Sequence, residues 1–306
     1  MKINKPDFWK KNNLVVYLLW PLSFFTNIFL ILKNKKNSYS SKINTICVGN
    51  IYLGGTGKTS LVIKIHDILK KKFKIFVIKK YYKNQVDEQK LLEKNTRLIL
   101  PKNRIEGIQK IEKYKNTIAI FDDGLQDKSI NYKISIVCFN SFSAVGNGKL
   151  LPAGPLRENL SELKNYNAVL INGNKNANLE KKIKSYKNNI KIFRGKYILK
   201  NKKIFSKKQN YLAFCGIGTP ESFFHLLKDN NIKVKHKLIF PDHYNYMDQD
   251  IKLINKLALN KNLKIVTTEK DYIKLKNIKK FKILFAEVDL KIYKLNNFKR
   301  FLFENL

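Results

Sequence analysis

The fold of this chain is decided by Val48-Gly49-Asn50-Ile51-Tyr52-Leu53-Gly54-Gly55-Thr56-Gly57-Lys58-Thr59. The apolar run 45–48 predicts a buried strand, and residues 58–72 carry apolar side chains at helical spacing. A strand, a glycine-rich turn and a helix in this order are typical of a P-loop, in which backbone N–H groups at the helix start bind phosphate. Tyr52 stands where the strict pattern has glycine, so an ordinary glycine-rich turn is the alternative.

A P-loop at this position predicts a site for ATP and Mg²⁺. Lys58 would contact the β- and γ-phosphates, and the Thr59 hydroxyl would bind Mg²⁺. The predicted nucleotide-binding residues are Tyr52, Leu53, Gly54, Gly55, Thr56, Gly57, Lys58 and Thr59.

The composition limits the classes of function. The chain has 306 residues, enough for two domains, and a formal net charge of +38, from 61 Lys and Arg against 23 Asp and Glu. The lysines are spread along the whole length, and no nucleic-acid-binding motif accompanies them. We therefore interpret the charge as a general attraction to anionic surfaces or substrates, and we expect no nucleic-acid partner.

Cysteine and histidine indicate neither a disulfide framework nor a structural metal. Cys47, Cys138 and Cys215 lie far apart in apolar runs, which indicates buried thiols in a reducing compartment. The four histidines show no metal-ligand spacing, so no structural zinc is expected.

Residues 14–32 are nearly continuously apolar, contain no charged residue and are flanked by lysines on both sides. Their length is at the lower limit for a membrane span, and basic flanks at both ends fit a helix lying in one leaflet at least as well. No small-residue cleavage site follows, which argues against a signal peptide. We expect a membrane-associated helix here, with a core helix as the alternative.

Acidic residues follow two later apolar runs. The strand expected at 74–78 leads through a polar loop to Asp87, and the strand expected at 117–121 ends in Asp122 and Asp123. Open α/β sheets bind ligands at the carboxyl ends of their strands, so these acids are candidate site residues. Asp122 fits the acid that holds Mg²⁺ in P-loop proteins, although Asp and Gly are also common in turns. Further along, Arg157 is a candidate phosphate ligand and Glu158 a candidate metal ligand.

Alternating strands and helices predict an α/β chain with two domains. Further strands are expected at 134–139, 168–172, 211–215 and 264–267, and further helices at 179–186, 220–227 and 248–259. Residues 192–205 alternate and turn at 200–202, which predicts a β-hairpin. We expect a membrane-associated helix in 1–40, a P-loop domain of α/β/α layers in 41–191, a hairpin hinge in 192–209 and a smaller α/β domain in 210–306.

A P-loop indicates a nucleoside triphosphate but not a reaction. The nearest match to the base-recognition motif of GTPases, at 174–177, lacks its Asp, and Leu53 stands where partition-type ATPases have a lysine. No arginine finger or nucleic-acid face of a motor is visible. A small-substrate kinase needs only phosphate positioning, Mg²⁺ and a base, and a membrane helix suggests a lipid acceptor. A membrane-bound ATPase switch is the alternative that is not a kinase.

Together and in order, the motifs at 48–59, 122–126, 151–158, 214–218, 240–243 and 267–271 resemble the tetraacyldisaccharide 4'-kinase family, the lipid A 4'-kinases of Gram-negative bacteria. The resemblance runs from the N-terminal apolar segment to about Leu275. It implies transfer of the ATP γ-phosphate to the 4'-hydroxyl of an acylated glucosamine disaccharide 1-phosphate, which gives lipid IVA. It also implies two α/β domains joined by a two-stranded hinge, and an N-terminal helix docked on the cytoplasmic face of the inner membrane. We further expect a monomer.

The resemblance assigns roles residue by residue. Asp87 matches the base toward the sugar hydroxyl and His243 its dyad partner, with Lys58 and Asp123 as further catalytic residues. The implied metal-binding residues are Thr59, Asp122, Gln126 and Glu158, and Arg157 is implied to bind nucleotide phosphate.

The chain departs from the family pattern near Asp87. Lys79-Lys80-Tyr81-Tyr82-Lys83 stands where the family usually has Ser-Arg-Gly-Tyr-Gly, and Asp127 and Tyr244 stand where it commonly has His. These differences leave an altered acceptor or a loss of activity open as alternatives. Five residues of the family pattern all remain, which favours an active enzyme: Lys58, Thr59, Asp87, Asp122 and His243.

Overall fold

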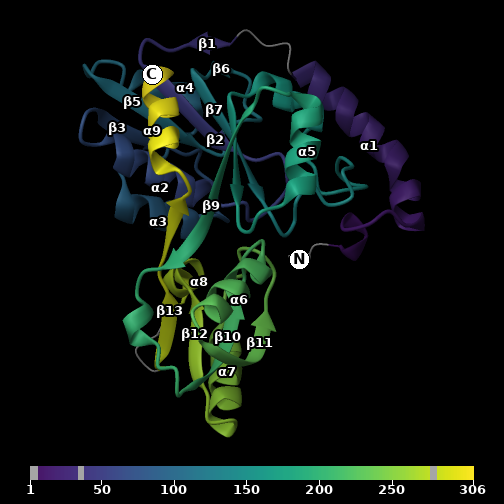
Figure 1. Ribbon diagram of the computed structural model, residues 1–306, viewed down its shortest axis with the longest axis vertical. Coiled ribbons are helices and arrows are strands. Elements are labelled where there is room, and N and C mark those ends of the chain that lie inside the picture. Colours follow the sequence, from purple (N-terminus) through teal and green to yellow (C-terminus); the bar gives the residue numbers. More distant parts are fainter. Residues whose placement is uncertain (1–5, 34–37, 276–280) are drawn as a thin grey trace. The chain divides into compact units, whose positions relative to one another are not determined.

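An eight-stranded sheet carries the glycine-rich stretch. In the computed structural model, which describes residues 6–33, 38–275 and 281–306, its strand order is β14-β9-β8-β7-β2-β5-β3-β4 (Figure 1). Strand β2 (Asn44–Gly49) lies between β5 (Thr117–Asp122) and β7 (Ile134–Asn140), and both pairs are parallel. The other strands are β3 (Lys74–Ile78), β4 (Leu98–Ile99), β8 (Ala168–Asn172), β9 (Lys191–Leu199) and β14 (Val288–Ile292).

The central strands form because they are apolar on both faces. Every residue of β5, β7 and β8 is buried, as expected for parallel strands covered on both sides. The strands expected at 74–78 and 168–172 coincide with β3 and β8, and those expected at 117–121 and 134–139 are each one residue longer. A short parallel pair, β1 (Tyr39–Ser40) with β6 (Ile130–Asn131), lies outside this sheet.

The chain divides into two units. We call one the P-loop unit, made of Lys5–Tyr82, Leu92–Lys196 and Ile292–Leu306. The other, the second unit, contains Lys83–Leu91 and Tyr197–Lys291.

Helix α2 (Lys58–Leu69) follows the glycines directly and packs on β2, β3 and β5. Its buried face contains Leu61, Ile65 and Leu69, the spacing that the sequence predicts. The other helices of the P-loop unit are α1 (Leu14–Lys33), α4 (Arg104–Gln109), α5 (Ala177–Tyr186) and α9 (Leu295–Glu304), with short 3₁₀ helices at Asp7–Trp9 and Leu160–Asn165. Helix α3 (Val86–Asn95) begins in the second unit and ends in the P-loop unit.

A four-stranded parallel sheet forms the second unit, in the order β11-β10-β12-β13. Alternate residues of β10 enter two different cores. Tyr211, Ala213 and Cys215 belong to one, and Leu212 and Phe214 to the other. The strands are β10 (Asn210–Cys215), β11 (Lys233–Ile239), β12 (Lys264–Thr268) and β13 (Ile283–Ala286); the helices are α6 (Pro220–Asp229), α7 (Asp248–Asn260) and α8 (Glu269–Lys274), with a 3₁₀ helix at Lys202–Ile204.

The hairpin expected at 192–205 is absent from the described residues. Strand β9 runs without a turn from Lys191 to Leu199, and the polar residues after it form a 3₁₀ helix. The neighbours of β9 in the sheet order are β8 and β14, and β14 lies far along the sequence. The prediction was wrong because alternation identifies a strand but not its partner.

The expected domain boundaries also differ from the two units. Helix α9 belongs to the P-loop unit, although 210–306 was expected to form one C-terminal domain. Phe298 and Phe301 of α9 contact Phe193 of β9, with ring centroids 4.9 and 5.3 Å away. Burial of these rings explains why the last helix joins the P-loop unit. The segment Lys83–Leu91, expected in the P-loop domain, belongs to the second unit.

The apolar segment 14–32 forms helix α1, but no helix in the described part of the chain is long and apolar enough to cross a membrane. The N-terminal membrane helix of the expected fold class is therefore not supported. Ser23 Oγ donates a hydrogen bond to the Leu150 carbonyl (2.9 Å), and Val16 is buried. Other apolar side chains of α1 are exposed, among them Leu14, Tyr17, Leu18, Trp20, Leu22, Phe24 and Phe25.

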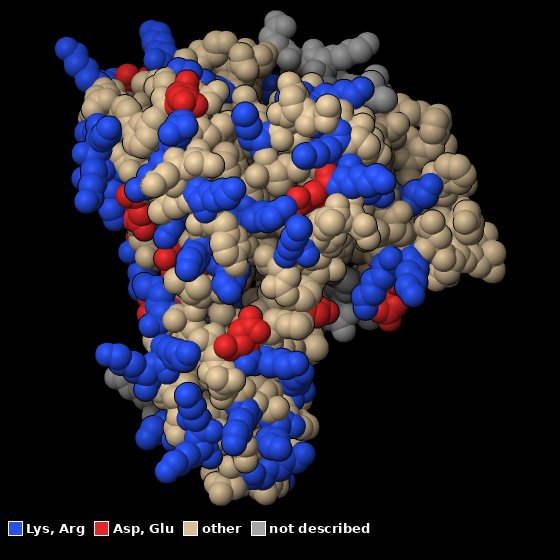
Figure 2. Space-filling view, viewed as in Figure 1, with Lys and Arg blue, Asp and Glu red and all other residues tan. Residues whose placement is uncertain are grey.

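Lys and Arg side chains are distributed widely over the surface. Figure 2 shows them scattered over the visible face, whereas the margin where Figure 1 places α1 is mostly free of either charge. The positive charge therefore forms no single stripe on this face, as its spread along the sequence predicts.

Candidate active site

The glycine-rich turn has the backbone that a P-loop requires. Gly54 and Gly57 adopt positive φ angles of 109° and 95°, which only glycine adopts without strain. Gly57 is the N-cap of α2, so the helix begins at Lys58 with its free N–H groups at the turn. The side chain of Asn50 donates hydrogen bonds to the carbonyls of Tyr52 (2.5 Å) and Gly54 (3.0 Å). This turn can bind the phosphates of a nucleotide.

A second loop supports the first half of the turn. Leu53 N donates to the Pro155 carbonyl (2.9 Å), and Arg157 N donates to the Ile51 carbonyl (2.7 Å). Tyr52 and Leu156 form an antiparallel bridge between these contacts. Tyr52 is buried there, so a bulky residue at this position has a structural role beside the glycines.

Asp122 ends β5 next to the start of α2. Its Oδ2 lies 3.4 Å from Thr59 Oγ1 and 2.9 Å from Lys79 Nζ. All three side chains are buried, and Lys79 and Asp122 are 1% and 0% exposed. The other carboxylate oxygen, Oδ1, has no hydrogen-bond partner among the described residues. A buried carboxylate with an open oxygen beside a threonine hydroxyl suits a cation.

Asp123 lies among cationic groups. Its Oδ1 is 3.6 Å from Lys58 Nζ and 2.9 Å from Arg157 Nη1, which also donates to Asn50 Oδ1 (2.7 Å). Burial alone would raise the pKa of Asp123, but the charges of Lys58 and Arg157 outweigh it and hold this pKa well below the ordinary value. Asp123 is therefore an ionised partner of Lys58 and Arg157.

Gln126 and Glu158 contact each other. Gln126 Nε2 donates to Glu158 Oε2 and to the Asn50 carbonyl, both at 3.0 Å, and the Tyr166 hydroxyl donates to the same Glu158 oxygen at 2.8 Å. Among the described residues, no hydrogen bond or ion pair joins Gln126 or Glu158 to Asp122. Burial and the neighbouring Glu158 carboxylate raise the pKa of Tyr166 far above its ordinary value, so its hydroxyl stays a donor.

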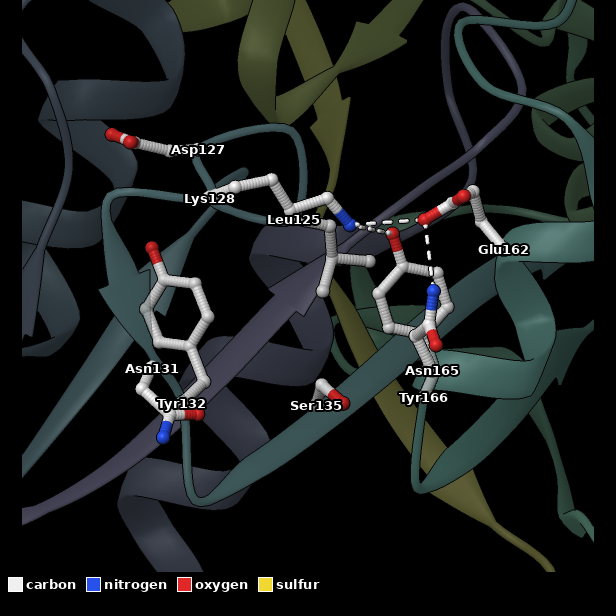
Figure 3. Close-up of a pocket in the computed structure, with 9 residues that line it drawn as sticks. All are labelled: Leu125, Asp127, Lys128, Asn131, Tyr132, Ser135, Glu162, Asn165 and Tyr166. Carbon is white, nitrogen blue, oxygen red and sulfur yellow. Dashed lines mark hydrogen bonds and ion pairs between the residues drawn. The ribbon is translucent and has the colours of Figure 1, made fainter. Parts of the chain in front are cut away.

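A cavity of about 340 Å³ borders this network. Figure 3 shows Lys128 with its ammonium between Glu162 and Tyr166, at 3.2 and 3.3 Å, and Asn165 donating to Glu162 at 3.1 Å. The lining is Leu125, Asp127, Lys128, Asn131, Tyr132, Ser135, Glu162, Asn165 and Tyr166. None of these residues belongs to the predicted nucleotide or metal set.

A carboxylate and an imidazole form a pair in the second unit. His243 Nδ1 lies 3.0 Å from Asp87 Oδ1 and 3.1 Å from Oδ2. Asp87 lies in the first turn of α3 and is 2% exposed. His243 has a positive φ of 55°, an uncommon conformation whose strain is of order 1 kcal/mol and which is concentrated at functional sites.

The motif at 267–271 positions this pair. Gly216 N donates to Asp271 Oδ2 (3.0 Å), and the Gly216 carbonyl accepts from His243 N (3.1 Å). Lys270 Nζ, in the same motif, lies 2.7 Å from Oε1 of Glu88, the neighbour of Asp87. Asp271 is fully buried and also accepts from Thr268 Oγ1 (2.7 Å), which fixes its orientation.

The pair shifts the pKa values of both members. Burial disfavours the charged form of each. For Asp87 the hydrogen bond with His243 and the charge of Lys270 outweigh burial, so the pKa lies below its ordinary value. For His243 the hydrogen bond with Asp87 and the charge of Asp242 outweigh burial, so the pKa lies above its ordinary value. Asp87 is therefore ionised at neutral pH and able to accept a proton.

No group of three or more His, Cys, Asp or Glu side chains in the described ranges could by itself hold a metal ion. The only acid within reach of Thr59 in the contacts above is Asp122. This fits Mg²⁺ bound to a nucleotide, which takes one or two protein carboxylates and keeps phosphate and water ligands.

A family model described as LpxK, tetraacyldisaccharide-1-P 4'-kinase, matches residues 15–306. The chain belongs to this kinase family. Two relatives in the family are each called tetraacyldisaccharide 4'-kinase. The protein from Pelagibacter ubique is 47% identical over 297 residues, 95% of each chain, and that from Rickettsia bellii is 34% identical over 296 residues, 90% of each chain.

The fold is also that of a solved family member. The structure of LpxK from Aquifex aeolicus in complex with ATP superposes with a TM-score of 0.71, covering 95% of this chain and 99% of that one at 23% identity. At this identity the likeness shows the fold alone.

The structure groups the family's candidate residues into two sets. In the P-loop unit Thr59 contacts Asp122, and Asp123 contacts both Lys58 and Arg157. In the second unit Asp87 contacts His243. Sequence reasoning missed Lys79, Asn50 and Asp271. A signal existed for Lys79, because it follows β3 at the same edge of the sheet as Asp122.

Proposed function

We propose that this chain carries out the reaction of its family, the transfer of the ATP γ-phosphate to the 4'-hydroxyl of tetraacyldisaccharide 1-phosphate, which gives lipid IVA in lipid A biosynthesis. The observation that carries the proposal is the buried Asp87–His243 pair, with Nδ1 and Oδ1 3.0 Å apart, in a chain that also has a complete Gly57-Lys58-Thr59 turn. A nucleotide switch has no need of an ionised base held by an imidazole.

The residues divide the chemistry between them. Lys58 and the N–H groups of α2 hold the ATP phosphates, and Arg157 adds a guanidinium that is already oriented by Asp123 and Asn50. Asp87 accepts the proton of the sugar hydroxyl as its oxygen attacks the γ-phosphorus. His243 orients the Asp87 carboxylate and stabilises its charge until that proton arrives. The bond between the γ-phosphorus and the bridging oxygen breaks, and ADP leaves.

Asp122 and Thr59 are the residues that would hold Mg²⁺ with the nucleotide. Asp122 Oδ1 is buried without a hydrogen-bond partner in the described residues, and the Thr59 hydroxyl lies beside Oδ2. When bound, Mg²⁺ neutralises charge on the β- and γ-phosphates. Gln126 and Glu158 already bind each other, so they would act through Asn50 and the turn unless they rearrange.

Helix α1 is proposed to bind the cytoplasmic surface of the inner membrane by lying in one leaflet. Leu18 and Phe25 are 70% and 66% exposed, and α1 contains no acidic residue in its first turn. Exposed aromatic and aliphatic groups on a helix flanked by lysines fit an interfacial helix. The acyl chains of the acceptor lie in the same leaflet.

The test is to follow γ-labelled ATP with tetraacyldisaccharide 1-phosphate in detergent and Mg²⁺. Label on the lipid, lost in Lys58→Ala, supports the kinase. Label released only as free phosphate, at a rate independent of the acceptor, supports the alternative of an ATPase switch and overturns the kinase. The matched control is Lys64→Ala, a lysine on the same helix α2 outside the turn.

A further inference from the structure

Lys79 occupies an unexpected place. It follows the last residue of β3, and Ile78 is in register with Phe121, so Lys79 lies beside Asp122 on the neighbouring strand. Its ammonium contacts Asp122 Oδ2 at 2.9 Å, and its side chain is 1% exposed. A lysine is almost never buried to this extent unless it is paired, so the ion pair accounts for its position.

The two oxygens of Asp122 have different surroundings. Oδ2 faces both Lys79 Nζ and Thr59 Oγ1, whereas Oδ1 has no hydrogen-bond partner among the described residues. A lysine on Oδ2 therefore leaves Oδ1 open to a cation. The same lysine places a positive charge close to any metal ion that binds there.

From this geometry we infer that Lys79 is a positioning residue whose charge neutralises that of Asp122. It strengthens the binding of nucleotide without metal, and it weakens the binding of the divalent cation. The inference rests on the proposed metal role of Asp122. Lys79 also stands where the family usually has Ser, so it is a property of this chain rather than of the family pattern.

Charge explains both effects. Without Lys79, Asp122 would present an uncompensated carboxylate beside the turn that binds phosphate, and its negative charge would repel ATP or ADP. With Lys79, the carboxylate is balanced, as Asp123 is by Lys58 and Arg157. A divalent cation then meets a carboxylate whose charge is already neutralised, and it binds less tightly.

The test uses Lys79→Gln, which keeps a hydrogen-bond donor near Asp122 and removes the charge. Lys79→Arg keeps the charge, and Lys80→Gln is the matched control on the adjacent, less buried lysine. Mn²⁺ is titrated into the full chain with saturating ADP, and free Mn²⁺ is followed by electron paramagnetic resonance with an ADP-only blank. ADP binding in EDTA is measured separately by calorimetry.

Lys79→Gln is expected to bind Mn²⁺ about tenfold more tightly and metal-free ADP about fivefold more weakly, while Lys79→Arg and Lys80→Gln stay within about twofold of the wild type. The changes in Mn²⁺ affinity and ADP affinity are thus expected to have opposite signs. If Lys79 had only a structural role, its loss would weaken the binding of both ligands. Mn²⁺ affinity that is unchanged or weaker in folded Lys79→Gln would overturn the inference.

A double variant tests the pairing even where the single variant is unstable. If Lys79→Gln folds poorly, the double variant Lys79→Gln with Asp122→Asn should regain melting temperature, because no buried charge remains unpaired. Failure to regain it would overturn the assigned pairing. No lipid acceptor is present in these assays, so failure of the lipid kinase proposal would leave their results unaffected.

Discussion

His243 Nδ1 faces both carboxylate oxygens of Asp87, at 3.0 and 3.1 Å, although 156 residues separate them in the sequence. Asp87 is held at the start of α3, and His243 is held by its backbone hydrogen bond to Gly216. Burial would raise the pKa of this carboxylate, but the imidazole and nearby cations outweigh burial and favour the ionised form. This relationship is the basis of the catalytic account.

Replacing Asp87 by Asn is expected to lower kcat for phosphate transfer by about 10²–10⁴-fold, because the general base is removed. The affinity for ATP should stay within about twofold, since Asp87 belongs to the second unit and the glycine-rich turn to the P-loop unit, whereas a Lys58→Ala control should lose it. Steady-state kinetics with both substrates would show this. A kcat within threefold of the wild type would place the base elsewhere.

The imidazole of His243 should titrate above its ordinary pKa of about 6.5, and its pKa should fall in Asp87→Asn. Asparagine removes the hydrogen-bonding anion that raises this pKa and leaves the effect of burial, which lowers it. Two-dimensional NMR of the full chain measures the shift, with His243→Gln to assign the signal. A pKa that is the same in both proteins would contradict the pairing.

The pair should also make stability depend on pH in two directions. The raised pKa of His243 gives stabilisation that is complete below about pH 6.5 and is lost as pH rises through the folded-state pKa. The lowered pKa of Asp87 gives stabilisation that is present above about pH 3.9 and is lost as pH falls through its folded-state pKa. The difference in unfolding free energy between wild type and His243→Gln should therefore be greatest between about pH 3.9 and about pH 6.5. A difference that grows above about pH 6.5 would contradict the pairing.

Gly124→Ala is expected to destabilise the P-loop unit by about 1–3 kcal/mol. A Cβ at this position would lie 2.8 Å from the Tyr132 hydroxyl and 2.9 Å from Cys47 Sγ, so buried neighbours must move. Urea denaturation followed by tryptophan fluorescence would measure the loss. An unchanged midpoint and slope would show that the loop after β5 relaxes freely.

Leu18→Glu is expected to weaken binding to vesicles of anionic phospholipid by about tenfold, since burying a leucine contributes roughly 1.5–3 kcal/mol. Leu259→Glu is the matched control, because Leu259 lies on α7 and is 71% exposed against 70% for Leu18. Co-sedimentation at several salt concentrations measures the affinity. Equal losses in the two variants would mean that α1 is not the membrane-binding surface.

The strands of the P-loop unit could be predicted from the sequence because buried parallel strands are continuous apolar runs. β3 and β8 match their expected bounds for this reason. The partner of β9 could not be predicted, since a strand's own residues do not specify which distant segment pairs with it. For this reason the prediction of a hairpin at 192–205 was wrong.

The site was predictable where a motif fixes its residues and less so where burial depends on tertiary contacts. The glycine-rich turn and Asp122 follow from local patterns, and Asp87 and His243 followed from the family resemblance. Lys79 was not singled out because a lysine after an apolar strand is usually exposed. Its burial depends on Asp122, which β5 brings to the adjacent position in the sheet.

Kinase activity toward the 4'-hydroxyl is best tested by locating the new phosphate on the product lipid. Purified chain is incubated with ATP, Mg²⁺ and tetraacyldisaccharide 1-phosphate, and the product is analysed by mass spectrometry and phosphorus–proton correlation NMR. We expect one added phosphate, correlated with the proton at the 4'-position and absent with Lys58→Ala. Intact acceptor with consumed ATP, or phosphate at another hydroxyl, would contradict it.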